Sequence, residues 1–231
     1  MEKKEILDAL KLLRENNTKR NFIQSLDLII NLKGMDVKRE DQRVDQFLSL
    51  PYECGKQVKV CAFVDKQLLK NAQDNCDFVI SNEDFQSYAK NKKELKKLAN
   101  GYDYFISQIN VMAEIAKIFG RVLGSRGKMP NPKVGCVVQG TVDLKSLVQK
   151  LKKTIHVVTR GEASIKAFIG MESMKDEELA ENIHFIYTHV VDSLPQTKNN
   201  IKNVLIKFTM GKPHEIGKEN ESTKLEKAGS K

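Results

Sequence analysis

The residues best suited to hold an anion lie in one segment, Gly120–Pro130, which reads Gly-Arg-Val-Leu-Gly-Ser-Arg-Gly-Lys-Met-Pro. Its glycines allow close approach of a backbone, while Arg126 and Lys128 supply positive charge. A Walker A loop, however, requires a glycine where Val122 stands and a Ser or Thr where Met129 stands. Without that hydroxyl the usual Mg²⁺ ligand is missing. The pattern therefore predicts an exposed basic loop that contacts a phosphate backbone, and it gives little support to ATP chemistry.

The other reactive residue types form no recognisable catalytic or metal-binding motif. No Ser or Cys nucleophile is paired with a His and an acid in a known motif, and no G-x-G-x-x-G is present. The four cysteines contain no C-x-x-C pair, which favours free and mostly buried thiols in a reducing cytosol. His184 and His189 are five apart and fall on different faces of a predicted helix. We therefore expect no enzymatic activity, no metal site and no cofactor.

The charge of the chain favours a polyanionic partner. Lys and Arg number 39 against 30 Asp and Glu, a formal charge of +9. Residues 121–153 carry eight of these cations against the single acid Asp143. Cations placed near phosphates release condensed counterions, although for residues 90–97 a solvated helix face is the favoured explanation. No secretory signal and no apolar run of about 20 residues is present, so we expect a cytoplasmic protein without a membrane span.

Hydrophobic periodicity predicts an α/β chain in three blocks. The first has a helix over 3–16 and strands over 22–32 and 44–50. The second starts with an apolar strand over 58–64 and alternates strands and helices up to a helix over 143–153, with Asp143 as its N-cap. The third has strands over 155–158, 165–169 and 204–210 and a helix over 175–192.

The outer two blocks are expected to share one sheet. This predicts a discontinuous α+β domain (1–56 and 154–216), an inserted Rossmann-like, three-layer α/β domain (57–153) and a flexible tail (217–231).

Three segments, taken together, resemble the family of large-subunit ribosomal protein L1. They are Arg20–Leu28 leading into Ser49–Pro51, Leu123–Pro132, and Phe208–Pro213. They occur in the order and spacing of the family, over about residues 1–216, in the style of its archaeal and eukaryotic branch. Two residues depart from the pattern of many members: Ser125 replaces a proline, and Lys212 separates Gly211 from Pro213 as in eukaryotic members. The family fold is the one that the periodicity predicts.

The resemblance implies a non-enzymatic structural protein of the large ribosomal subunit. Such a protein binds the rRNA of the mobile stalk, helps tRNA to leave the exit site, and represses its own mRNA by binding an rRNA-like hairpin. The implied contacts lie mainly in the split domain, where Phe22 can pack on a base and Ser25 and Asp27 can reach ribose hydroxyls. The residues expected to bind RNA are Arg20, Asn21, Phe22, Gln24, Ser25, Asp27, Asn203, Thr209, Met210 and Gly211, with Arg126 and Lys128 as a secondary contact.

Two other classes of function remain open from the sequence. A nucleotide-dependent enzyme built on the insert would bind a small nucleotide saturably and would need Lys128. A protein-interaction scaffold with an incidentally basic surface would show no salt-sensitive binding of RNA.

Overall fold

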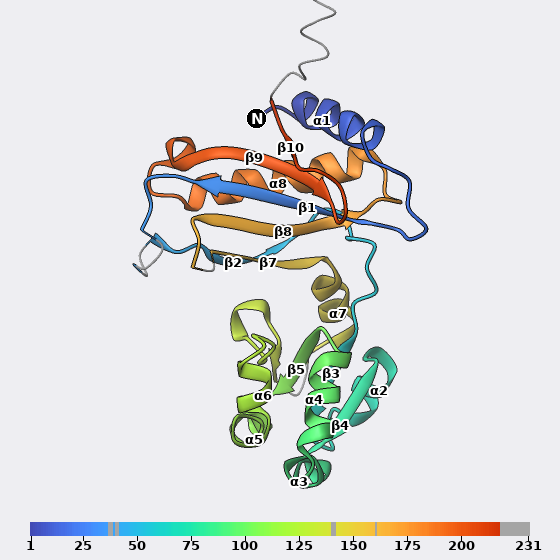
Figure 1. Ribbon diagram of the computed structural model, residues 1–231. Helices are drawn as coiled ribbons and strands as arrows, with labels where there is room; N and C mark the ends of the chain where they lie inside the picture. The colour runs from blue at the N-terminus through green and yellow to red at the C-terminus, as the bar shows by residue number, and fades with distance from the viewer. Residues whose placement is uncertain (37–38, 40–41, 140–141, 160, 218–231) are drawn as a thin grey trace, which may run out of the picture. The chain divides into compact units, whose positions relative to one another are not determined.

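The computed structural model describes residues 1–217 except 37–38, 40–41, 140–141 and 160 (Figure 1). Contacts divide the chain into a split unit, Met1–Lys56 with Lys153 onward, and an insert, Gln57–Lys152. The predicted boundary had left Lys153 in the insert. Helix α7 (Leu144–Lys153) runs directly into strand β7 (Thr154–Val158), so its last residue already belongs to the split unit. The predicted flexible tail lies outside the described residues beyond Gly217.

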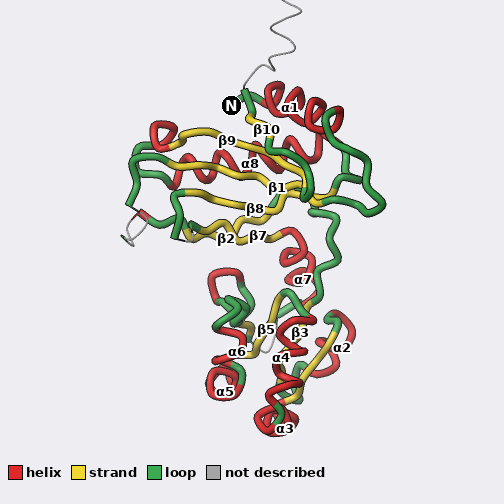
Figure 2. The backbone as a smooth tube through the Cα atoms, in the orientation of Figure 1, coloured by secondary structure: helices red, strands yellow, loops and turns green. Residues whose placement is uncertain are grey.

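The split unit is built on an antiparallel sheet whose central strands come from opposite ends of the chain. The strand order is β10-β9-β1-β8, comprising His214–Glu215, Ile201–Phe208, Ser25–Leu32 and Ser164–Met171. Figure 1 shows the blue β1 between the orange-red β9 and the gold β8. Helix α8 (Asp176–Ser193) lies behind this sheet in Figure 2, and α1 (Lys3–Glu15) packs against α8 and β9. A two-stranded ribbon of β2 (Asp45–Ser49) and β7 completes the unit.

Alternation along β1 and β9 decides which face of the sheet is covered. Every second residue of β1, from Leu26 to Leu32, is buried, and Val204, Ile206 and Phe208 are buried in β9. Because side chains alternate across a strand, the intervening residues share the opposite, half-exposed face. The predicted strand at 204–210 begins three residues and ends two residues too late, because β9 spans Ile201–Phe208. Thr209 and Met210 leave the strand in a turn, which the Gly211 N–H closes by donating to the Phe208 carbonyl at 2.9 Å.

The insert is a parallel sheet with helices, which confirms the predicted α/β class. Its strand order is β4-β3-β5-β6, comprising Phe78–Ser81, Val60–Val64, Tyr104–Gln108 and Val137–Val138. All five residues of β3 are buried, as its apolar run predicts for a central parallel strand. The helices are α2 (Leu69–Asn75), α3 (Phe85–Lys90), α4 (Lys92–Gly101), α5 (Met112–Ile118) and α6 (Gly120–Gly124). Asp143 accepts from the Lys145 N–H at 3.0 Å and so caps α7 as expected.

An aromatic cluster forms the core of the insert. The Phe63 ring on β3 lies 5.7 Å from Phe85, 5.7 Å from Phe105 and 4.8 Å from Phe119, centroid to centroid. All four side chains are essentially fully buried. Such rings combine a large apolar area with favourable edge-to-face geometry, so this cluster dominates the packing of the insert.

We expect Phe63→Ala to lower the free energy of unfolding of the insert by about 3–5 kcal/mol, because it removes a buried ring and leaves a cavity. Amide hydrogen exchange, read separately for residues of the two units, measures this loss. Phe22→Ala is the matched control, since Phe22 is 53% exposed. Equal losses in the two variants would contradict the assigned core.

Candidate RNA-binding surface

Thr209 and Ser25 join the two ends of the split unit at one edge of the sheet. The Thr209 N–H donates to the Ser25 carbonyl at 3.1 Å, and the Ser25 N–H donates to Thr209 Oγ1 at 3.1 Å. The Thr209 hydroxyl also lies 3.3 Å from Ser25 Oγ. Two predicted RNA contacts, separated by 184 positions in the chain, therefore form one polar pair, in which Thr209 is exposed and Ser25 half-exposed.

Gln24 supports this edge from beneath. Its side chain is fully buried, and its Oε1 accepts from the Met210 N–H at 3.2 Å. Its own backbone binds Glu172 twice, since the N–H donates to Glu172 Oε2 at 3.3 Å and the carbonyl accepts from the Glu172 N–H at 2.8 Å. The structure therefore buries the Gln24 side chain away from solvent, and a direct contact between Gln24 and RNA stays a prediction. Gln24 positions the backbone of Met210.

Arg14 fixes the segment that holds Gln24. Its Nε pairs with Asp176 Oδ1 at 2.7 Å, while its two terminal nitrogens donate to the carbonyls of Glu172 at 2.8 Å and Met174 at 2.9 Å. The planar guanidinium suits such a multiple anchor, because its donors point in fixed directions. A chain of contacts thus runs from α1 through Glu172 and Gln24 to Met210.

Large exposed side chains flank this edge. Met210 is 62% exposed, Phe22 is 53% exposed, and Arg20 and Asn21 are also exposed. Ile23 is 60% exposed and was not among the predicted contacts. Exposed apolar groups that gather beside polar and basic ones mark a binding surface more often than a folding requirement.

A pocket of about 480 Å³ opens next to the Thr209 turn. It brings together the predicted residues Arg20, Met210 and Gly211. A Cβ on Gly211 would meet Asn17 Oδ1 and Phe208 Cβ, both at 3.4 Å, so glycine lets the loop after α1 come close. Sequence reasoning missed the remaining lining: Leu13, Asn16, Asn17, Thr18, Lys212, Pro213 and His214. The polar run after the predicted helix was the available signal for the first loop.

Asp27 and Asn203 lie on the half-exposed face of the sheet, but at different places. Asp27 is paired in register with Lys207, a cation that the sequence analysis did not single out. Burial raises the pKa of Asp27, and the charge of Lys207 opposes that rise. Asn203 accepts from Asn31 Nδ2 at 2.7 Å. Asn31 is six residues along β1 from Ser25, or about 20 Å away. Its partner Asn203 therefore lies well away from the Ser25–Thr209 pair.

The predicted basic loop of the insert is partly helical, and one of its two predicted cationic contacts is hydrogen-bonded within the insert. Residues Gly120–Gly124 form α6, and Lys128 Nζ donates to the carbonyls of Ala99 at 3.0 Å and Tyr102 at 2.7 Å. Lys128 therefore satisfies carbonyls at the C-terminal end of α4, and its role as a secondary RNA contact stays a prediction. Arg126 remains exposed.

The described residues contain no group of three or more His, Cys, Asp or Glu side chains that could hold a metal ion. The four cysteines are free, and burial raises the pKa of Cys54, Cys76 and Cys136 to about 11 and also raises that of Cys61. These thiols stay protonated at neutral pH and are poor nucleophiles. Within the described part of the chain, no helix is long and apolar enough to cross a membrane.

Together these features define a two-unit α/β protein. The surface around Ser25 and Thr209, with its adjacent pocket, is suited to binding a large polar ligand. Comparison with known proteins narrows this class. A model of the ribosomal protein L1p/L10e family matches residues 13–212, and the chain belongs to that family.

Curated relatives named large ribosomal subunit protein uL1 support the same assignment. That of Methanothermobacter thermautotrophicus is 36% identical over 208 residues, covering 90% of this chain and 96% of the relative. Those of Methanococcus voltae and Methanothermococcus thermolithotrophicus are each 39% identical, covering 91% and 94% of this chain and 97% and 100% of the relatives. Family membership confirms the resemblance, a structural role as a ribosomal protein and a cytoplasmic, ribosomal location. The relatives are named as ribosomal components, not as enzymes.

We expect Lys128→Met to lower stability by about 1–3 kcal/mol, because it leaves two carbonyls of the insert without their donor. Affinity for RNA should stay within about twofold of wild type, since Nζ is already engaged. Thermal unfolding and equilibrium RNA binding test the two parts. A variant of unchanged stability with much weaker RNA binding would support Lys128 as a contact.

The raised pKa of Asp27 predicts a pH-dependent stability. Its native pKa lies above the unfolded value of 3.8, so the native state binds more protons between the two, and stability falls as pH rises through this window. Asp27→Asn removes this effect. The variant should therefore be more stable than wild type by a larger margin at pH 7 than at pH 3, with the free energy of unfolding measured by denaturant titration. Asp8→Asn, at an exposed acid of α1, is the control, and an equal gain there would reject the effect.

Proposed function

We propose that the chain is a constituent of the large ribosomal subunit and that its split unit binds the rRNA of the mobile stalk. The names of the relatives support the subunit. The observation that carries the RNA surface is the Ser25–Thr209 junction, where Thr209 is exposed and Ser25 half-exposed, within a few residues of the exposed Phe22 and Met210. This junction needs both halves of the split unit and is not required to fill its core.

The chemistry of the surface matches that of a folded RNA. Unstacked bases bind to exposed aromatic side chains, so Phe22 offers a stacking platform. The hydroxyls of Ser25 and Thr209 can exchange hydrogen bonds with a ribose 2′-hydroxyl, which acts as both donor and acceptor. Arg20 and Lys212 line the adjacent pocket and supply phosphate contacts that set the register of the RNA.

Two further roles belong to the same proposal. The protein helps tRNA to leave the exit site, with Arg126 of the insert as a secondary RNA contact. It also represses its own mRNA by binding an rRNA-like hairpin. Because a single surface would bind the rRNA and the hairpin, the two RNAs would compete, and repression would follow an excess of the protein over rRNA.

Equilibrium binding to a stalk rRNA fragment and to a scrambled RNA, across a salt series, tests the rRNA proposal. We expect Phe22→Ala to weaken binding to the stalk fragment about 5- to 150-fold, the usual value of one base stacked on an aromatic side chain. Thr209→Val should weaken it about tenfold, because valine keeps the volume and loses the hydroxyl.

Matched variants separate recognition from folding. Thr209→Ser retains a hydroxyl and should recover most of the affinity. Tyr52→Ala removes another exposed aromatic side chain of the split unit, 39% exposed, and should leave affinity within about twofold. Equal affinity for both RNAs, falling steeply as salt rises, would show that the protein binds RNA through its charge alone and would reject specific recognition.

A further inference from the structure

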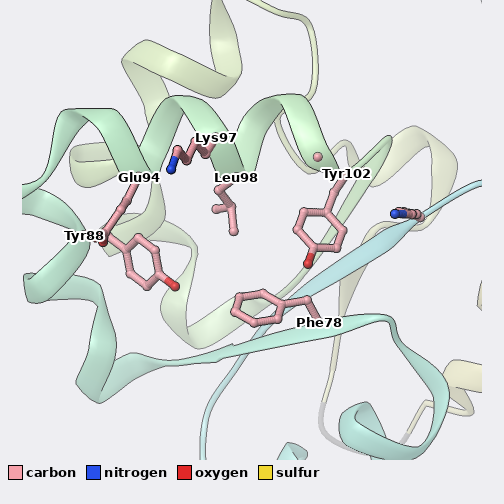
Figure 3. Close-up of a pocket in the computed structure, with 8 residues that line it drawn as sticks. Phe78, Tyr88, Glu94, Lys97, Leu98 and Tyr102 are labelled. Carbon is pink, nitrogen blue, oxygen red and sulfur yellow. The ribbon is translucent and has the colours of Figure 1, made fainter.

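A second pocket lies in the insert, away from the carboxyl ends of the parallel strands (Figure 3). Its volume is about 380 Å³. It is lined by Lys59 just before β3, Phe78 at the start of β4, and Tyr88, Glu94, Lys97, Leu98, Gly101 and Tyr102 from α3, α4 and the loop before β5. Open α/β sheets bind dinucleotides at the opposite, carboxyl edge. This pocket is therefore not the usual cofactor site of such a sheet.

Aromatic side chains form an apolar wall of this pocket, in which two rings are stacked on each other. The rings of Phe78 and Tyr102 are nearly parallel, with an angle of 22° and centroids 5.7 Å apart. In Figure 3 these two rings and that of Tyr88 surround one space, into which Leu98 points from α4. Phe78 is 37% exposed although it begins a strand of the central sheet. A wall of this kind can stack a planar ring.

Charged groups at the rim are free to meet a ligand. Lys59 and Lys97 are exposed, and neither ammonium forms an ion pair with any other described residue. The nearby carboxylates of Asp77 and Asp103 are engaged, since they accept from the backbone N–H groups of Val60 at 2.7 Å and Lys59 at 3.3 Å.

The remaining polar groups of the pocket can form hydrogen bonds with the edge of a bound ring. Burial raises the pKa of Tyr88 and Tyr102, so both hydroxyls keep their protons at neutral pH and can donate. The Glu94 carboxylate can accept from an amino group. The pocket thus combines a stacking wall, two hydroxyl donors, one acceptor and two cations.

We propose that this pocket binds one nucleoside phosphate, with the base against Phe78 and Tyr102 and the phosphate at Lys59 and Lys97. A planar ring joined to an anion uses both the wall and the lysines. An aliphatic acid leaves the wall unused, and a simple cation is repelled by the two ammonium groups. The ligand arrives either as a free mononucleotide or as an unstacked nucleotide of an RNA strand. The site is separate from the surface proposed on the split unit, so either proposal can fail alone.

Nuclear magnetic resonance of the full chain, with labelled Phe and Tyr rings, locates binding directly. Adenosine and uridine 5′-monophosphates and the matching tetraribonucleotides are titrated separately. We expect saturable shifts of the Phe78, Tyr88 and Tyr102 resonances. Tetranucleotides that bind at least tenfold more tightly than mononucleotides identify an RNA strand as the source, while equal affinities identify a free nucleotide. RNA that binds the proposed surface of the split unit is expected to shift the labelled Phe22 resonance instead.

Variants test the two halves of the pocket. Phe78→Ala should weaken binding about 5- to 150-fold, and Lys97→Gln at least threefold. Lys96→Gln removes the same charge from a neighbouring exposed position of α4 outside the pocket, and it should change affinity by less than twofold. Since Lys97 is exposed, its variant tests the proposal even if Phe78→Ala perturbs the fold. Three outcomes would overturn the proposal. One is that the resonances show no shift up to about 10 mM nucleotide, and another is that Lys97→Gln and Lys96→Gln bind the nucleotide with equal affinity. The third is that tetramethylammonium binds more tightly than the nucleotides.

Discussion

The placement of β1 between β8 and β9 is the constraint on which the split unit depends. β1 has no sequence neighbour to pair with, since both of its partners follow the insert. Its buried face is completed only when α1 and α8 cover the sheet, so neither half of the unit can bury its apolar residues alone. Pairing of distant strands carries a loop-closure cost, and the insert reduces it by folding its own residues compactly.

The same pairing creates the edge that we propose to bind RNA. Ser25 precedes the buried run of β1, and Thr209 follows the buried run of β9, so antiparallel register brings them together. Beneath them, Arg14 and Glu172 hold Gln24, and Gln24 holds the backbone of Met210. These hydrogen bonds hold the backbone of Met210 while its side chain stays exposed, which would lower the entropic cost of the proposed RNA binding.

Positive charge in the insert serves several different purposes. Lys128 is used inside the fold as a hydrogen-bond donor to carbonyls, whereas Lys59 and Lys97 border a pocket and Arg126 is exposed. A count of basic residues therefore overstates the charge available to a polyanion. The environment of each ammonium group decides whether it stabilises the protein or can bind a ligand.

The sequence by itself determined the α/β class, the central strand β3 and the amphipathic elements, because hydrophobic periodicity reflects local geometry. It also determined the family, because three separate motifs occur in register. Tertiary structure alone decided that Gln24 is buried, that Lys128 is engaged, and that Asn203 lies about 20 Å along the sheet from Thr209. It alone also gathered the aromatic wall of the insert, whose residues come from separate elements. Strand register and long-range packing set these features, and neither can be read from the spacing of residues along the chain.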